Sequence, residues 1–259
     1  MIYTFSKLGT WGALGNQLFE IAGVIGEAIK DGADARFPDW YYKKFFDIPE
    51  EYFEPIPEGE KVVDFFELPQ PYNYMQDLKH WFSRAYMQVT DALSFSDEAW
   101  ELFFKTYPEF PLEDTVGVHV RRGNNLQLPD YHPVCDIEYF ENALKLVAPY
   151  KHMIVASDDL DWCKQQPLFA NATFAKGNDA DVNIYDLTGP VPLALDTAFI
   201  DFMFLAQADS LVISNSSYSW WAAMLSYSPD VVYPGSKWYG PKLDHIDISN
   251  LFPENWKSL

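Results

Sequence analysis

In the first third of the chain, apolar residues recur at helical spacing between residues 18 and 29, and residues 33–90 show no regular pattern. The apolar run at residues 1–6 predicts a buried strand. After a glycine-containing turn, apolar residues recur every three or four positions, which predicts a helix that ends at Asp31 and Gly32. Residues 33–90 are rich in proline and aromatic residues, with one further strand predicted at residues 61–68. The apolar positions of the helix are Leu18, Ile21, Ala22, Ile25, Ala28 and Ile29.

In the second half, short apolar runs alternate with amphipathic stretches. Strands that alternate with helices form a parallel sheet covered by helices, so the predicted fold class is α/β. We place a domain boundary in the proline-containing stretch before this region, which gives domains of residues 1–112 and 113–259. Strands are predicted at residues 115–120, 152–157, 173–175, 210–214 and 230–234, and helices at residues 97–107 (capped by Ser96), 136–148, 158–166, 196–208 and 216–226.

Two adjacent arginines, Arg121 and Arg122, follow the strand predicted at residues 115–120. Alternation along a strand places His119 and Arg121 on one face, opposite three valines. The chain has only four arginines, so half of them stand at this strand end. The planar guanidinium of arginine suits bidentate binding of phosphate or carboxylate. The pair is therefore a candidate anion site, and the alternative is two charged side chains that extend into solvent.

The formal net charge of −20 narrows the range of partners. Nucleic acids and acidic membranes attract basic surfaces, so neither is predicted as a partner. A protein this acidic must build an anion site from locally placed cations, which gives the arginine pair more weight. The chain has two cysteines, no signal peptide and no apolar run long enough to cross a membrane, so a soluble, cytoplasmic protein is predicted.

A glycine-rich turn precedes the first helix and contains Gly12, Gly15, Asn16 and Gln17. Unpaired amides at the start of a helix bind phosphate favourably, so this turn is a candidate phosphate cradle. Its spacing matches neither a dinucleotide fingerprint nor a P-loop. A tight turn that needs glycine for its backbone accounts for the same residues.

Asp201 lies among mainly apolar neighbours in the helix predicted at residues 196–208. A carboxylate in such a place is expected to be buried and to need a partner. The two N–H donors of a guanine edge are one candidate, and a lysine, an arginine or a backbone amide is the other. Ser216 and Ser217, between a strand and a helix, form either a second anion cradle or a helix N-cap.

Five motifs occur in an order and spacing that resemble the bacterial family 11 glycosyltransferases, the α-1,2-fucosyltransferases. They are GALGNQLFE, GVHVRRGNNLQLPDYHPVCDIEYFENAL, VASDDLDWC, ADSLVISNSSYSWWAAMLS and PENWKSL. The α-1,6- and protein O-fucosyltransferases share the HxRR motif and are more distantly similar. The resemblance covers nearly the whole chain. It implies a GT-B architecture of two Rossmann-like domains with a cleft between them, an acceptor-side first domain, a GDP-sugar-binding second domain, and last residues that pack back on the first domain.

The same resemblance implies the reaction and the residues that carry it. L-fucose moves with inversion from GDP-β-L-fucose to a hydroxyl of a glycan, expected to be O2 of galactose, without a metal or other cofactor. Arg121 contacts the β-phosphate, Asp201 takes the guanine edge, and Asp130 is the candidate base. The donor-binding residues are Asn16, which faces the fucosyl phosphate across the cleft, His119 near the guanosine, Arg121, Arg122, Asp158, Asp159, Asp201, and Ser216 and Ser217 at the phosphates.

The sequence departs from the family pattern at Asn124, where HxRRGD would place an acid. This departure leaves open a catalytically weak homologue that binds a nucleotide sugar. A metal-dependent transferase with another donor is a further alternative, because residues 159–161 and 179–181 match the DxD pattern. Such triplets arise easily by chance among 38 acidic residues, and the five histidines show no ligand spacing, so no metal site is predicted.

Overall fold

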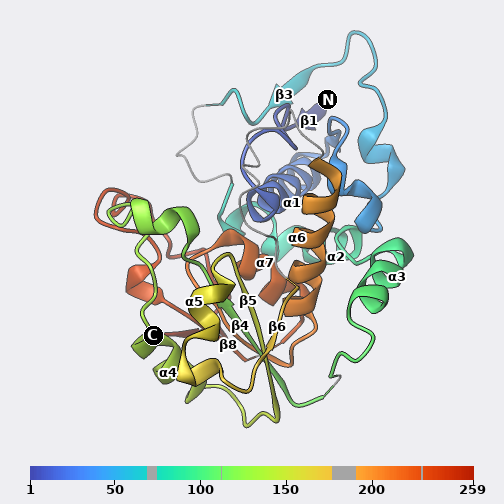
Figure 1. Cartoon of the computed structure of the whole chain (residues 1–259). Helices are drawn as coiled ribbons and strands as arrows, with labels where there is room; N and C mark the ends of the chain where they lie inside the picture. The colour runs from blue at the N-terminus through green and yellow to red at the C-terminus, as the bar shows by residue number, and fades with distance from the viewer. Residues whose placement is uncertain (69–74, 112, 177–190, 229) are drawn as a thin grey trace. The chain divides into compact units, whose positions relative to one another are not determined.

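The computed structural model describes residues 1–68, 75–111, 113–176, 191–228 and 230–259 (Figure 1). The chain forms two compact units. One consists of Met1–Glu101 and Ile246–Pro253, and the other of Leu102–His245 and Glu254–Leu259. This division falls before the boundary of 112 and 113 chosen from the sequence, and that boundary stays a prediction.

The first unit is built on a short parallel sheet of three strands in the order β2-β1-β3. Helix α1 ends where the sequence predicts, because Gly32 adopts a left-handed conformation with φ of 64° and its N–H caps the carbonyls of the last turn. The elements of this unit are β1 (Ile2–Thr4), α1 (Leu14–Asp31), β2 (Asp34–Ala35), β3 (Val62–Asp64), α2 (Phe82–Ala92) and the 3₁₀ helices Tyr41–Phe45, Glu50–Phe53 and Leu78–His80. Helix α3 (Asp97–Thr106) begins in this unit, and the Ser96 hydroxyl caps it by accepting the Ala99 N–H at 3.3 Å.

The second unit contains a parallel sheet of six strands in the order β6-β5-β4-β7-β8-β9. The predicted α/β alternation is confirmed, although most elements are shorter than their predicted ranges. The strands are β4 (Thr115–Val120), β5 (His152–Ser157), β6 (Thr173–Phe174), β7 (Ser210–Val212), β8 (Val231–Tyr233) and β9 (Lys257–Ser258). The helices are α4 (Ile137–Leu144), α5 (Leu160–Lys164), α6 (Val191–Ala206) and α7 (Ser217–Leu225), with 3₁₀ helices at Gly123–Gln127, Pro167–Phe169 and Gly235–Lys237.

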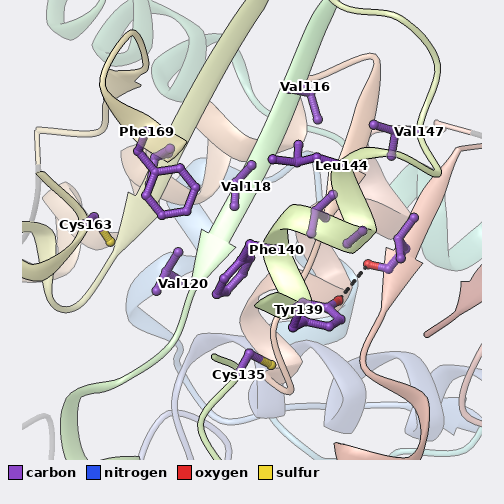
Figure 2. Close-up of a cluster of buried hydrophobic side chains, with 14 residues drawn as sticks. Val116, Val118, Val120, Cys135, Tyr139, Phe140, Leu144, Val147, Cys163 and Phe169 are labelled. Atoms are coloured by element: carbon purple, nitrogen blue, oxygen red, sulfur yellow. Dashed lines mark hydrogen bonds between the residues drawn. The ribbon is translucent and has the colours of Figure 1, made fainter. Parts of the chain in front are cut away.

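Strand β4 lies between β5 and β7 and is buried along its whole length. Its three valines lie on one face and pack with Phe140 of α4 and Phe169 in the core of this unit (Figure 2). The Tyr139 hydroxyl, also on α4, donates to the Ile213 carbonyl at 2.7 Å and ties the helix to the chain beyond β7. On the other face, a Cβ at Gly117 would lie 2.9 Å from the Ala208 Cβ. Packing on both faces therefore holds β4 in place, and with it the residues that follow the strand.

Candidate functional site

The backbone at the end of β4 is joined to the segment that follows β7 through Ser214. The Ser214 hydroxyl accepts the Arg121 N–H at 3.1 Å and donates to the His119 carbonyl at 2.7 Å. Ser214 is fully buried, so these bonds are shielded from water. The hydroxyl thus fixes the direction in which the chain leaves the sheet and carries both arginines.

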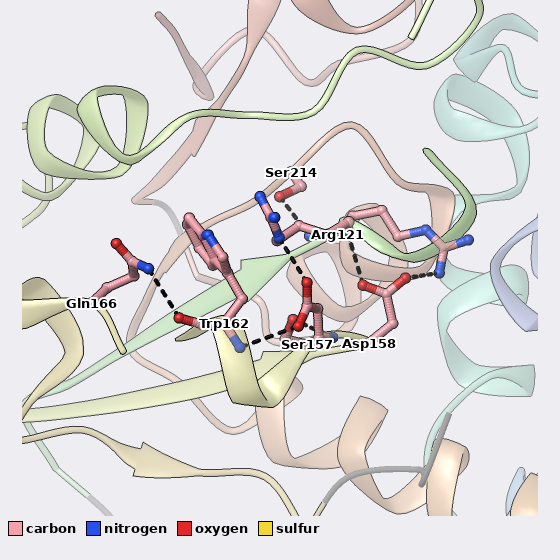
Figure 3. Close-up of polar contacts among 8 residues, drawn as sticks. Arg121, Ser157, Asp158, Trp162, Gln166 and Ser214 are labelled. Carbon is pink, nitrogen blue, oxygen red and sulfur yellow. Dashed lines mark hydrogen bonds and ion pairs between the residues drawn. The ribbon is translucent and has the colours of Figure 1, made fainter. Parts of the chain in front are cut away.

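The Arg121 guanidinium is held on two of its nitrogens, and Figure 3 shows the contact with Asp158. Nη1 donates to Oδ2 of Asp158 in an ion pair, and Nη2 donates to Oδ1 of Asn124 at 2.5 Å. The other Asp158 oxygen, Oδ1, accepts the Arg122 backbone N–H at 2.8 Å. Asp158 and Asn124 therefore orient the guanidinium together, and each terminal nitrogen keeps a second hydrogen for a ligand.

The second arginine has its own carboxylate and its own aromatic contact. Arg122 Nε donates to Oδ2 of Asp159 at 2.9 Å, and its guanidinium lies 4.0 Å from the centre of the Trp162 ring. Oδ1 of Asp159 accepts the Trp162 N–H at 3.1 Å and caps α5. The helix predicted from residue 158 therefore begins at Leu160, with Asp159 as its cap.

These contacts also bear on the DxD pattern at residues 159–161. Both oxygens of Asp159 are already bonded, and Asp161 is exposed. Within the described ranges, no group of three or more His, Cys, Asp or Glu side chains could hold a metal ion. The second triplet, at residues 179–181, lies outside the described residues.

Each arginine of the pair faces a carboxylate, so the two ion pairs balance two positive charges with two negative ones. The sequence led us to expect a local excess of positive charge at this strand end. The pair therefore offers a ligand directed N–H donors without a net positive charge. Arg121 keeps 33% of its side chain exposed, so a ligand can reach it.

His119 is 5% exposed at the end of β4, with its ring 5.4 Å from that of Tyr218 on α7. Burial, together with the nearby charge of Arg121, lowers the pKa of His119 to about 3, so the imidazole is neutral at ordinary pH. In the part of the chain that the structure describes, its Nδ1 has no hydrogen-bond partner. The ring therefore offers an uncharged hydrogen-bonding nitrogen beside the arginine pair.

Asp201 is buried, as the sequence predicts, at 7% exposure on α6. Its Oδ1 accepts a hydrogen bond from the Tyr107 hydroxyl at 2.6 Å, and the Lys176 backbone N–H donates to the same hydroxyl at 2.7 Å. The buried carboxylate is thus satisfied in part by a phenolic hydroxyl. Sequence reasoning missed Tyr107 because it lies 94 positions from Asp201 and no local pattern marks it.

The loop before α7 is shaped by Asn215. Its Nδ2 donates to the carbonyls of Pro133 at 2.9 Å and Trp238 at 3.2 Å. Ser216 is the N-cap residue of α7, but its side chain makes no capping hydrogen bond. Its carbonyl accepts the Trp220 N–H at 3.0 Å and the Ser219 hydroxyl at 3.3 Å.

Comparison of the sequence with family models shows which family the chain belongs to. The model described as Glycosyl transferase family 11 matches residues 30–257. The chain belongs to this family. Within the described ranges, none of the helices combines the length and the apolar character needed to cross a membrane.

Two Escherichia coli relatives of this family 11 chain show moderate similarity. An alpha-1,2-colitosyltransferase is 25% identical over 150 residues, which is 55% of this chain and 47% of the relative. The O-antigen biosynthesis glycosyltransferase WbnK is 28% identical over 153 residues, which is 56% and 45% of the two chains. The chain spans about half the length of the curated relatives it matches.

Solved fucosyltransferases share the fold. The NodZ α-1,6-fucosyltransferase soaked with GDP-fucose has a TM-score of 0.53 and 14% identity, with 92% of this chain and 96% of that chain covered. Another NodZ structure is from Bradyrhizobium. An Arabidopsis thaliana FUT1 mutant with GDP has a TM-score of 0.51 and 12% identity, with coverages of 92% and 73%. These likenesses confirm the α/β fold of the GT-B type.

The described hydrogen bonds and ion pairs of two further predicted site residues involve neither Arg121 nor Arg122. Asp130 is exposed in the second unit and faces Lys242, with 3.6 Å between its Oδ2 and the lysine Nζ. Asn16 belongs to the first unit, where its Oδ1 accepts from Gln76 Nε2 at 3.0 Å. Of the four residues predicted in the glycine-rich turn, Gly12 alone precedes α1, whereas Gly15, Asn16 and Gln17 lie in its first turn, because the helix already begins at Leu14. Gln17 Nε2 donates back to the Gly12 carbonyl at 2.9 Å. The roles assigned to Asp130 and Asn16 stay predictions.

Proposed function

We propose that this family 11 glycosyltransferase moves L-fucose from GDP-β-L-fucose to a hydroxyl of a glycan, with O2 of a terminal galactose as the acceptor position. The alpha-1,2-colitosyltransferase among its relatives supports a 1,2 linkage. The NodZ structure soaked with GDP-fucose supports the donor. The observation that carries the proposal is Arg121, partly exposed at a strand end and oriented by Asp158 and Asn124.

The reaction is a displacement at the anomeric carbon of fucose. The acceptor oxygen bonds to this carbon as the bond from the carbon to the β-phosphate oxygen breaks, and GDP leaves with the electron pair. The acceptor proton passes to a base, for which Asp130 is our candidate. Negative charge grows on the β-phosphate, and the N–H donors of Arg121 stabilise it. Loss of one preorganised donor of this kind costs ~10² to 10³ in rate.

The nucleoside is recognised by the buried residues of the second unit. Asp201 accepts hydrogen bonds from the guanine edge, and since a carboxylate oxygen accepts more than one bond, Tyr107 and the base do not compete. His119 bonds the guanosine through Nδ1, which has no partner among the described residues. Ser216 and Ser217 meet the phosphates with the first amides of α7.

The experiment is incubation of the purified chain with GDP-fucose and a lactose-type acceptor, with GDP release and the fucosylated product both measured. We expect both, with the product linked through galactose O2. GDP binding without transfer or donor hydrolysis would favour a nucleotide-sugar-binding homologue. A colitosyl donor used in place of fucose would favour the activity that one relative's name describes.

A further inference from the structure

We propose that Asp158 is a positioning residue that supplies the negative charge holding Arg121 in its phosphate-binding orientation, in a clamp shared with Asn124 and given space by Gly123. The inference rests on the proposed function for what Arg121 binds. The clamp itself rests on contacts within the second unit alone.

The side-chain bonds of Asp158 run to the arginine segment. Oδ2 pairs with Arg121 Nη1, and Oδ1 accepts the Arg122 backbone N–H at 2.8 Å. The carboxylate is thus fixed by one side chain and one backbone group, so it cannot turn toward another partner without losing a bond. The side chains of Asp158 and Arg121 are 20% and 33% exposed, so solvent screens the ion pair only in part.

Two alternative roles for Asp158 conflict with its surroundings. It does not cap the following helix, because Asp159 fills that position with Oδ1 on the Trp162 N–H. It does not suit a phosphate ligand, because a carboxylate repels another anion. Orientation of Arg121 is the role that its contacts describe.

Gly123 gives an independent reason to assign this role to Asp158. A Cβ built on Gly123 would lie 2.3 Å from Oδ2 of Asp158 and 3.0 Å from its Cγ. The backbone at Gly123 is not left-handed, so the need for glycine here is one of space. Any side chain at this position would push the carboxylate away from the Arg121 guanidinium.

The clamp is asymmetric in charge. Asn124 Oδ1 accepts from Nη2 but carries no charge, whereas Asp158 carries one and accepts from Nη1. Both residues accept hydrogen bonds from terminal nitrogens of the same planar guanidinium. A carboxylate at position 124 instead of position 158 would therefore pair with Nη2 of the same guanidinium instead of Nη1. Exchanging the acid and the amide between these two positions provides the test.

The variants are Asp158→Asn, Asp158→Asn with Asn124→Asp, Arg121→Ala, and Arg121→Ala with Asp158→Asn. The matched control is Asp161→Asn, which removes the same charge from an exposed position on α5. We expect Asp158→Asn to lower kcat/KM for GDP-fucose by about tenfold or more, and the added Asn124→Asp to restore most of it. In the Arg121→Ala background, Asp158→Asn should change the rate by less than about twofold.

A second readout does not depend on activity. The chain has four arginines, so its guanidinium ¹⁵N spectrum is simple, and the Arg121→Ala variant identifies the Arg121 signals. We expect slow rotation of the Arg121 guanidinium in the natural chain, faster rotation in Asp158→Asn, and slow rotation again when Asn124→Asp is added. Gly123→Ala should also speed rotation, because its methyl group would displace the Asp158 carboxylate. In the Asp158→Ala background, where this carboxylate is absent, Gly123→Ala should have no further effect on rotation.

Unchanged rotation in Asp158→Asn, or a folded Asp158→Asn variant that Asn124→Asp does not rescue, would overturn the clamp. If the natural chain neither binds GDP nor transfers fucose, the proposed function fails, and the spectrum still decides whether Asp158 holds Arg121.

Discussion

Tyr107 donates its phenolic hydrogen to Oδ1 of Asp201, with 2.6 Å between the two oxygens. Burial, and then the charge of Asp201, raises the pKa of Tyr107 above its ordinary value, so the hydroxyl stays a donor at neutral pH. The Lys176 N–H donates to the same hydroxyl and holds it in place. These bonds hold in place the Asp201 carboxylate, which we propose accepts hydrogen bonds from guanine.

Asp201→Asn should weaken GDP binding while the fold is kept. The amide offers one acceptor oxygen where guanine presents two donors, and a lost charge-assisted bond costs about 1.5 to 3 kcal/mol. Calorimetry of GDP binding measures the change. Tyr107→Phe is the companion variant, and it should weaken binding less because it leaves both carboxylate oxygens in place. GDP affinity equal to that of the natural chain in Asp201→Asn would return Asp201 to a structural role.

Arg121→Lys should damage transfer nearly as much as Arg121→Ala. Asp158 and Asn124 bond two different nitrogens of the guanidinium. The single ammonium nitrogen of lysine cannot make both bonds and still present directed donors to phosphate. We expect a loss of ~10²-fold or more in kcat for both variants. Arg84→Lys, in the first unit, is the matched control and should stay near natural activity. A lysine variant that keeps most of its activity would contradict the phosphate contact.

Asn124→Asp alone should change turnover by no more than about tenfold, equivalent to ~1.4 kcal/mol in the barrier. Asn124 already provides a hydrogen bond, and Asp158 already provides the charge, so a second acid adds little. Steady-state kinetics with GDP-fucose measures this. An inactive natural chain that this substitution converts into a strong transferase would show that the acid was essential.

Chelation should leave activity unchanged. We expect transfer in excess EDTA at the rate measured without it, because the proposed mechanism meets the diphosphate with arginine and amide donors. Initial rates with EDTA, and with Mn²⁺ added back, are the measurement. Complete loss on chelation with recovery in Mn²⁺ would favour the metal-dependent alternative.

Glu20 makes folding stability depend on pH. It is fully buried on α1, and neither carboxylate oxygen has a partner among the described residues. Desolvation raises its pKa to about 10, so the folded chain keeps a proton that the unfolded chain releases above its ordinary pKa. Its contribution to stability is therefore complete below the ordinary pKa and is lost as pH rises toward 10, by at most ~1.4 kcal/mol per pH unit.

Glu20→Gln should remove this slope. Urea unfolding of both chains between about pH 5 and about pH 8 should show the free energy of unfolding of the natural chain falling relative to that of the variant. The control Glu58→Gln changes an exposed position and should follow the natural chain. Parallel curves for Glu20→Gln and the natural chain would show that Glu20 is ionised in the fold.

The sequence alone determined most elements of the second unit, although it predicted neither β9 nor the start of α6 at Val191. Buried strands leave apolar runs, and helices leave apolar residues at three- and four-residue spacing, all within a few neighbouring positions. In the first unit, Gly32 likewise marks the end of α1. The arginine pair was visible too, because the end of β4 follows from the same local pattern. The motif resemblance led to the family that the comparison shows.

Tertiary structure alone decided how those residues are held. Asp158 lies 37 positions from Arg121, and Tyr107 lies 94 positions from Asp201. Such pairs form only when parallel strands and helices bring distant segments together, and no local spacing encodes them. The same holds for Gly123, whose lack of a side chain matters because of a carboxylate that approaches from another strand end. Local periodicity fixes which groups a strand presents, whereas the packing of the sheet decides which charge meets them.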